Sequence, residues 1–146
     1  MRGGVELRPW RMNSPVLIVA LGGSVCGVDP KTGAWLWKNA LSGGGFGEVA
    51  ISVHEGFVIA SANGPLVFCL DSATGNALWQ AATERPGRAT LLVQGDRVYV
   101  AKTGVVDCFD LDGHRLWSQQ LPALGSGRLA LGFPGNVVQA DDIGAQ

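Results

Sequence analysis

The feature of this sequence that most constrains its fold is an internal repeat built around an aspartate, a glycine and a tryptophan. In each of three copies, the glycine follows the aspartate by three or four residues and the tryptophan follows the glycine by four. The tryptophans are 42 and 38 residues apart. A period of about 40 residues is typical of the blades of a β-propeller rather than of a helical solenoid. The repeated residues are Asp29, Gly33, Trp37, Asp71, Gly75, Trp79, Asp110, Gly113 and Trp117.

Short apolar runs alternate with turn-forming residues between these anchors. In the second copy, residues 49, 51 and 53 are aliphatic and alternate with Ala50 and Ser52, which predicts a strand with one buried face. Each Asp-to-Gly segment predicts a tight turn, because aspartate accepts hydrogen bonds from amides ahead of it and glycine tolerates positive φ. Glycine supplies 22 of the 146 residues. This excess fits a fold with many turns between buried strands.

The strand pattern divides the chain into three units and part of a fourth. The first unit has three expected strands and lacks an innermost one, the second and third have four each, and the last segment has two. We therefore expect an all-β chain that forms a single partial β-propeller over residues 1–146, with about three four-stranded antiparallel blades and extra strands. The units cover approximately residues 16–41, 48–82, 89–120 and 128–140.

The repeat also resembles a known family. A small residue stands two positions before each aspartate, and the whole pattern runs from Gly27 to Trp37, from Cys69 to Trp79 and from Cys108 to Trp117. It is similar to the tryptophan-docking motif of the PQQ-like β-propeller repeats. The resemblance implies that each of the three repeated tryptophans packs between neighbouring blades.

The expected strands are too few to close even a four-bladed ring, and open sheet edges promote aggregation. Either the chain is a fragment of a longer propeller or it completes a ring with another copy of itself. We expect a homodimer with six blades, since closed homo-oligomers are most often two-fold dimers. Residues 128–133 of the partner could supply the missing innermost strand of the first unit, which would leave 137–140 surplus. Residues 5–11 could fill that place instead.

Composition and charge limit the partners. The chain has eleven basic and twelve acidic residues and a formal net charge of −1. This balance predicts no nucleic-acid partner and no anionic membrane surface. No segment approaches the roughly 20 apolar residues of a membrane helix. The apolar run 16–21 ends at two glycines and is in register with the repeat, so we expect a strand rather than a signal peptide.

The three cysteines have no C-x-x-C spacing, which predicts neither a disulfide framework nor a zinc site and favours a cytoplasmic location. Cys69 and Cys108 occupy equivalent positions in adjacent units, and packed sheets lie too far apart for a disulfide between them. We expect both to be small buried residues beside the tryptophans. Cys26 is shifted by one position and is expected to face the other side of its sheet.

No set of residues in the sequence predicts catalysis. The resemblance raises the question of a quinone cofactor, but the adjacent cysteines of the family's dehydrogenases have no counterpart, so no cofactor and no metal are expected. His54 and His114 fall in turns and are expected to be exposed. The glycine-rich segment 43–47 precedes a strand rather than a helix, which predicts a linker and not a phosphate loop.

These observations predict a non-catalytic scaffold that binds an unknown protein partner. The residues most suited to such contacts are Trp10, Trp35, Arg85 and Arg88, because aromatic and arginine side chains dominate interface energetics. The alternative for Trp35 is a structural role in which it covers the outer edge of its blade. An alternative is a ligand-binding or enzymatic propeller with a site in its central channel, formed on dimerisation. The expected innermost strands offer only Glu48, Ser52 and Thr90 to such a site.

Overall fold

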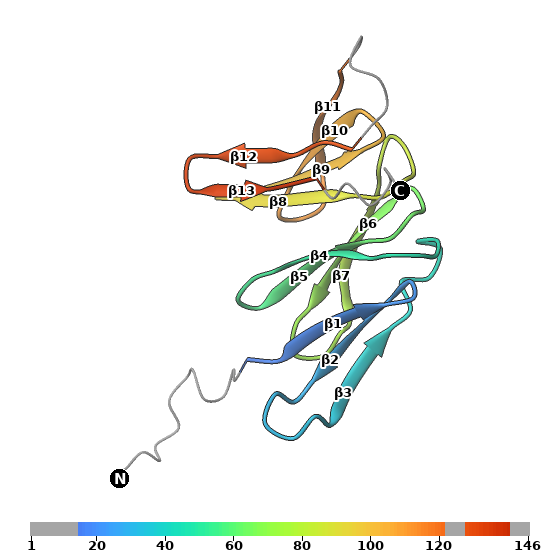
Figure 1. Ribbon diagram of the computed structural model, residues 1–146, viewed down its shortest axis with the longest axis vertical. Helices are drawn as coiled ribbons and strands as arrows, with labels where there is room; N and C mark the ends of the chain where they lie inside the picture. The colour runs from blue at the N-terminus through green and yellow to red at the C-terminus, as the bar shows by residue number, and fades with distance from the viewer. Residues whose placement is uncertain (1–14, 122–127, 141–146) are drawn as a thin grey trace.

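The computed structural model of the chain describes residues 15–121 and 128–140. These residues form thirteen strands in four antiparallel sheets (Figure 1). The expectation of an all-β chain with propeller-like blades is confirmed. Among the described residues, no helix is long and apolar enough to cross a membrane.

Each sheet is a simple meander in which strands adjacent in sequence pair with one another. Blade 1 contains β1 (Leu17–Leu21), β2 (Ser24–Val28) and β3 (Trp35–Asn39). Blade 2 contains β4 (Ala50–Val53), β5 (Phe57–Ser61), β6 (Leu66–Asp71) and β7 (Ala77–Ala82). Blade 3 contains β8 (Thr90–Gln94), β9 (Arg97–Lys102), β10 (Val105–Asp110) and β11 (Arg115–Gln120). A final hairpin joins β12 (Leu131–Phe133) and β13 (Asn136–Val138).

The blades stack face to face in chain order, with blade 1 and blade 3 at opposite ends (Figure 1). Two apolar cores lie between them. Successive side chains of a strand point to opposite faces, so Val58 and Ala60 of β5 enter the core shared with blade 1 whereas Ile59 enters the core shared with blade 3. The central strand β5 of blade 2 is therefore buried on both faces.

The first blade has no innermost strand among the described residues. Residues 5–11, one of the two segments expected to fill that place, lie outside the part of the chain that the structure describes. The other segment, 128–133, contributes β12 to the hairpin, which contacts β8 of its own chain. The hairpin thus lies against the inner strand of blade 3, where the first two strands of a fourth blade would lie.

Candidate functional site

The docking turns are held by their aspartates and glycines. In blade 2, Asp71 Oδ1 accepts a hydrogen bond of 2.8 Å from the amide of Ala73, and its carbonyl accepts one of 2.7 Å from Gly75. Gly75 has φ +78°, in the left-handed region that favours glycine. The turns of blades 1 and 3 repeat this arrangement at Asp29 and Asp110. Hydrogen bonds from the amides of His114 and Asp112 lower the pKa of Asp110.

Each repeated tryptophan stands opposite the small residue of the motif. The pairs are Gly27 with Trp37, Cys69 with Trp79 and Cys108 with Trp117. The strand register shifts directly after the small residue in all three blades. Such a bulge re-aims side chains, so the same local irregularity sets the direction of all three indoles.

Two of these tryptophans dock on the turn of the following blade. Trp37 Nε1 donates a hydrogen bond of 3.1 Å to the carbonyl of Ser72, and its ring lies so close to Gly75 that a Cβ there would be 2.3 Å from Cε3. Trp79 repeats the contact one blade further on, with a bond of 2.8 Å to the carbonyl of Leu111. A Cβ at Gly113 would be 2.6 Å from the Trp79 ring.

The third tryptophan and the first turn lack this contact within the described residues. Trp117 packs at 6.1 Å from Tyr99 but remains 45% exposed. At Gly33, which has φ +79°, a Cβ would meet nothing within 4 Å. The outward face of β1 is also open, since Leu17 and Leu21 are exposed. In the part of the chain that the structure describes, Trp117 of blade 3 therefore has no turn to dock on, and the turn of blade 1 has no docked indole.

The hairpin covers only the inner part of the outer face of blade 3. Phe133 packs against Tyr99 with a centroid distance of 5.5 Å. Asn136 Nδ2 donates hydrogen bonds of 2.9 Å to the carbonyl of Val93 and 2.8 Å to Gln94 Oε1. The outer strand β11, which carries Trp117, lies beyond this cover.

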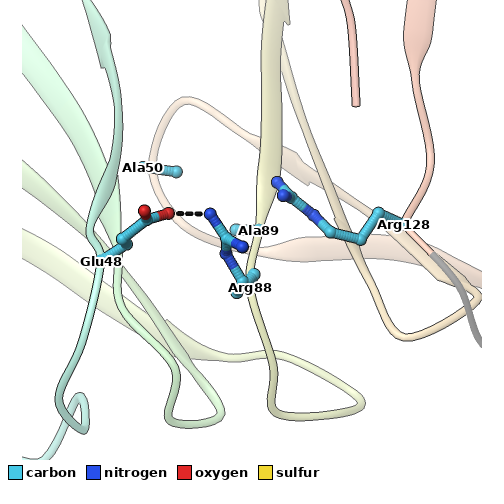
Figure 2. Close-up of a pocket in the computed structure, with 5 residues that line it drawn as sticks. All are labelled: Glu48, Ala50, Arg88, Ala89 and Arg128. Atoms are coloured by element: carbon cyan, nitrogen blue, oxygen red, sulfur yellow. Dashed lines mark hydrogen bonds and ion pairs between the residues drawn. The ribbon is translucent and has the colours of Figure 1, made fainter. Parts of the chain in front are cut away.

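A charged cluster lies at the inner edge of the stack, where β4 and β8 are in contact. Glu48, Arg88 and Arg128 line a pocket of about 190 Å³ together with two alanines (Figure 2). Arg88 forms an ion pair with Glu48 across two blades. The cluster was not predicted from the sequence, although a signal for it is present: each of the three residues follows a glycine, and they are spaced 40 residues apart.

The structure places the residues suggested as partner contacts in different settings. Trp35 is 69% exposed on β3. Arg85 Nη1 donates a hydrogen bond of 2.9 Å to the carbonyl of Thr103, so both it and Arg88 make contacts within the chain. Trp10 lies outside the described residues. Of the polar residues on the expected innermost strands, Thr90 is buried and Ser52 bonds His54.

Lys102 is a buried lysine that no sequence pattern predicted. Its Nζ reaches from β9 to the turn after β5, where it donates hydrogen bonds of 2.9 Å and 2.6 Å to the carbonyls of Ala62 and Gly64. Burial lowers the pKa of Lys102 to about 8, and the negative charge of Asp107 opposes this shift. The side chain therefore ties blade 3 to blade 2 rather than facing a ligand.

The cysteines are free and buried. Burial raises the pKa of the Cys69 thiol to about 11 and also raises that of Cys108, as is typical of inert structural thiols. Cys26 pairs with Lys38 instead of a tryptophan, so it points to the opposite face of its sheet. This agrees with the expectation.

The expectation of two exposed histidines was half wrong. His114 is 75% exposed, but His54 is half-buried because it stacks on Phe57 at 5.0 Å and Ser52 Oγ lies 2.7 Å from its Nε2. Burial lowers the pKa of His54. His114 Nδ1 lies 3.1 Å from Asp110 Oδ2 in the docking turn of blade 3, so each histidine is bonded to one polar neighbour.

Stacked antiparallel blades joined by a repeated tryptophan contact define a β-propeller of the PQQ-like repeat class. The chain belongs to this family: the family model described as outer membrane protein assembly factor BamB matches residues 21–144. No curated protein matches the chain.

Among solved structures, BamB from Moraxella catarrhalis is similar over 77% of this chain, with a TM-score of 0.63 and 26% identity. The chain spans 37% of the length of that BamB. A europium-containing methanol dehydrogenase matches over 73% of this chain and 23% of its own, with a TM-score of 0.54 and 17% identity. A quinohemoprotein alcohol dehydrogenase from Pseudomonas putida matches over 72% of this chain and 19% of its own, with a TM-score of 0.57 and 17% identity. At 17% identity, the likeness to the two dehydrogenases shows the fold alone.

Proposed function

We propose that this chain is a non-catalytic protein-binding module that takes part in the assembly of outer membrane proteins. The observation that carries the proposal is the match of residues 21–144 to a family model whose description names such an assembly factor. The surface of the blades supports it. The residue before each docking tryptophan is an exposed leucine on an outermost strand, namely Leu36, Leu78 and Leu116.

Trp35 is the proposed anchor on this surface. It lies next to Leu36 on β3, and both side chains are more than half exposed, at 69% and 51%. Large aromatic side chains that become buried on binding contribute most to interface energies. A rigid stack of blades would hold this pair in place for an apolar segment of an outer membrane protein that has not yet folded.

The test uses an outer membrane β-barrel polypeptide, kept unfolded, as the binding partner on a biosensor surface. The wild-type chain should bind saturably, and Trp35→Ala should weaken binding at least about tenfold, as expected for loss of an aromatic anchor. Trp35→Phe is the matched control and should retain most of the affinity. Absence of saturable binding would contradict the protein-binding role. Equal affinities of all three proteins would contradict the assignment of Trp35.

The proposal includes a homodimer in which residues 128–133 complete blade 1 of the partner. β13 pairs with β12 along the edge that β1 of the partner would need, so this donation requires β13 to move away. Native mass spectrometry should detect a dimer, and deletion of the residues after Gly127 should abolish it. A wild-type monomer contradicts the dimer and leaves the protein-binding role to its own test.

The cytoplasmic location favoured by the cysteines remains a prediction. The family description favours the cell envelope instead, because an outer membrane assembly factor acts there. Fractionation of cells that express the full-length gene product decides between the two. Recovery with the cytosol would contradict the assembly role, whereas recovery with the envelope would contradict the location inferred from cysteine usage.

The alternative function is a ligand site at the inner edge of the blades. The pocket that Glu48, Arg88 and Arg128 line favours it, because two guanidinium groups near one pocket suit a carboxylate ligand (Figure 2). Calorimetric titration with citrate as the probe tests this alternative. Binding that Arg128→Gln removes would support it, and no heat of binding would contradict it.

A further inference from the structure

The contact between a docking tryptophan and the turn of the next blade occurs twice within the described residues. At each end of the stack of blades, one of its two partners is present without the other. Trp37 docks on the turn of blade 2 and Trp79 on the turn of blade 3, each through an indole N–H to a carbonyl and a ring against a glycine. Trp117 of blade 3 has the equivalent strand position and stands opposite the equivalent small residue, Cys108. Within the described residues it has no turn to dock on. The turn of blade 1 has the same hydrogen bonds, and no indole of the described residues docks on it.

The tryptophan of blade 3 and the turn of blade 1 resemble the partners of the two complete contacts. Gly33 and Gly75 have nearly equal φ values, +79° and +78°. The residue after the aspartate provides the accepting carbonyl in both complete contacts, at Ser72 and Leu111, and Pro30 holds that position in blade 1. Trp117 of β11 and Leu17 and Leu21 of β1 are large apolar side chains that remain exposed.

The tryptophan of blade 3 and the turn of blade 1 cannot meet within one copy. β3 and β11 lie at opposite ends of the stack of blades (Figure 1). Two copies in head-to-tail order would each supply one tryptophan and one turn, and two such contacts would close a ring by two-fold symmetry. A second copy is the occupant that fits, since it brings the same matched pair to both open ends.

We propose that Trp117 of one copy docks on the Asp29-to-Gly33 turn of a second copy, with its Nε1 donating to the carbonyl of Pro30. This inference rests on the homodimer of the proposed function and adds a second contact between its two copies. The indole ring would lie against Gly33 as that of Trp37 lies against Gly75. The exposed side chains of β1 would then face blade 3 of the other copy.

Sedimentation velocity over a range of concentrations tests the contact. Trp117→Ala and Gly33→Ala, which alter opposite ends of the stack, should each weaken the dimer at least about tenfold, because a central aromatic anchor is lost or blocked. Trp117→Phe keeps a ring but loses the donor and should be intermediate. Gly95→Ala is the matched control, because Gly95 combines positive φ with open space.

A mixing experiment separates docking from a general loss of structure. Trp117→Ala retains an intact turn and Gly33→Ala retains an intact tryptophan, so a mixed dimer recovers one of the two contacts. We expect the mixture to associate more tightly than either variant alone. Circular dichroism melts identify any variant that fails to fold, and Trp117→Phe then carries the test.

The outcomes distinguish this contact from the dimer itself. A wild-type chain that stays monomeric at all concentrations would overturn both the dimer and the contact. A wild-type dimer that none of the variants weakens would overturn the contact and leave the dimer standing. If both variants are folded and their mixture associates no more tightly than either variant alone, the proposed tryptophan contact would also be overturned.

Discussion

At the scale of single residues, the docking turn requires glycine for two independent reasons. Gly75 has positive φ, and a Cβ there would lie 2.3 Å from the ring of Trp37. Gly95 has positive φ as well, at +61°, but open space around it. A comparison of the two positions therefore separates backbone strain from steric exclusion by the indole.

We expect Gly95→Ala to lower the free energy of unfolding by about 1–2 kcal/mol, the usual cost of the left-handed conformation. Gly75→Ala should lower the free energy of unfolding by a further amount of about 1–3 kcal/mol, because the added methyl group pushes Trp37 from its site. Urea unfolding followed by circular dichroism measures both. Equal losses for the two variants would mean that the docked indole adjusts at no cost.

Single residues also mark the limit of what the sequence predicts. The Asp, Gly and Trp positions could be found because the same residues recur at the same spacing in three blades and form a local turn or a contact between successive blades. Lys102 could not, because its partners are carbonyl oxygens about 40 residues away, and no side chain at either end signals such a contact. His54 was misjudged because its burial depends on stacking with Phe57 across the turn.

At the scale of elements, Lys102 joins β9 of blade 3 to the turn between β5 and β6. Its pKa falls from 10.5 to about 8 in the folded chain because of burial. Between these values, the unfolded chain binds more protons than the folded one, so the stability of the folded chain rises with pH across this window. The charged form of this lysine is the one that burial disfavours.

Lys102→Met should be less stable than wild type, because two buried carbonyls lose their donor at a cost of about 1–3 kcal/mol. The difference in the free energy of unfolding between wild type and Lys102→Met should increase from pH 8 to pH 10.5, since only the wild type gains stability when Lys102 loses its proton. Thermal melts at several pH values measure it, and Lys38→Met, at an exposed position of β3, is the control. A difference that stays constant with pH would mean that Lys102 keeps its ordinary pKa when folded.

The strands themselves were the most predictable elements. Short apolar runs bounded by turn residues indicated strands close to their observed bounds, as for residues 16–21 and β1 (Leu17–Leu21). The glycine-rich linker was recognised as a linker, but its packing was not. Gly64 donates a hydrogen bond of 2.7 Å to the carbonyl of Gly44, and a Cβ on Gly45 would be 2.5 Å from Gly64 N. Such close approach of two backbones has no side-chain signature.

At the scale of the whole molecule, the blades differ in how well they are covered. Both faces of β5 are buried, and Val58, Ile59 and Ala60 are fully inaccessible. β1 buries Ile18 against blade 2 but leaves Leu17 and Leu21 at 52% and 77% exposure. A stack of this kind unfolds from its less covered end, because each blade is stabilised mainly by its neighbours.

Hydrogen exchange followed by mass spectrometry should therefore show an order within one chain. In dilute solution, amides of β1 should exchange at least about tenfold faster than those of β5, since local opening needs less free energy where fewer apolar contacts break. If a second copy docks on blade 1, protection of β1 and of the turn from Asp29 to Gly33 should rise with protein concentration, while that of β5 stays constant. Trp117→Ala should remove this rise and leave the order of exchange unchanged. Equal protection of β1 and β5 in dilute solution would contradict the difference in coverage, because it would require a blade with one open face to be as stable as a blade packed on both.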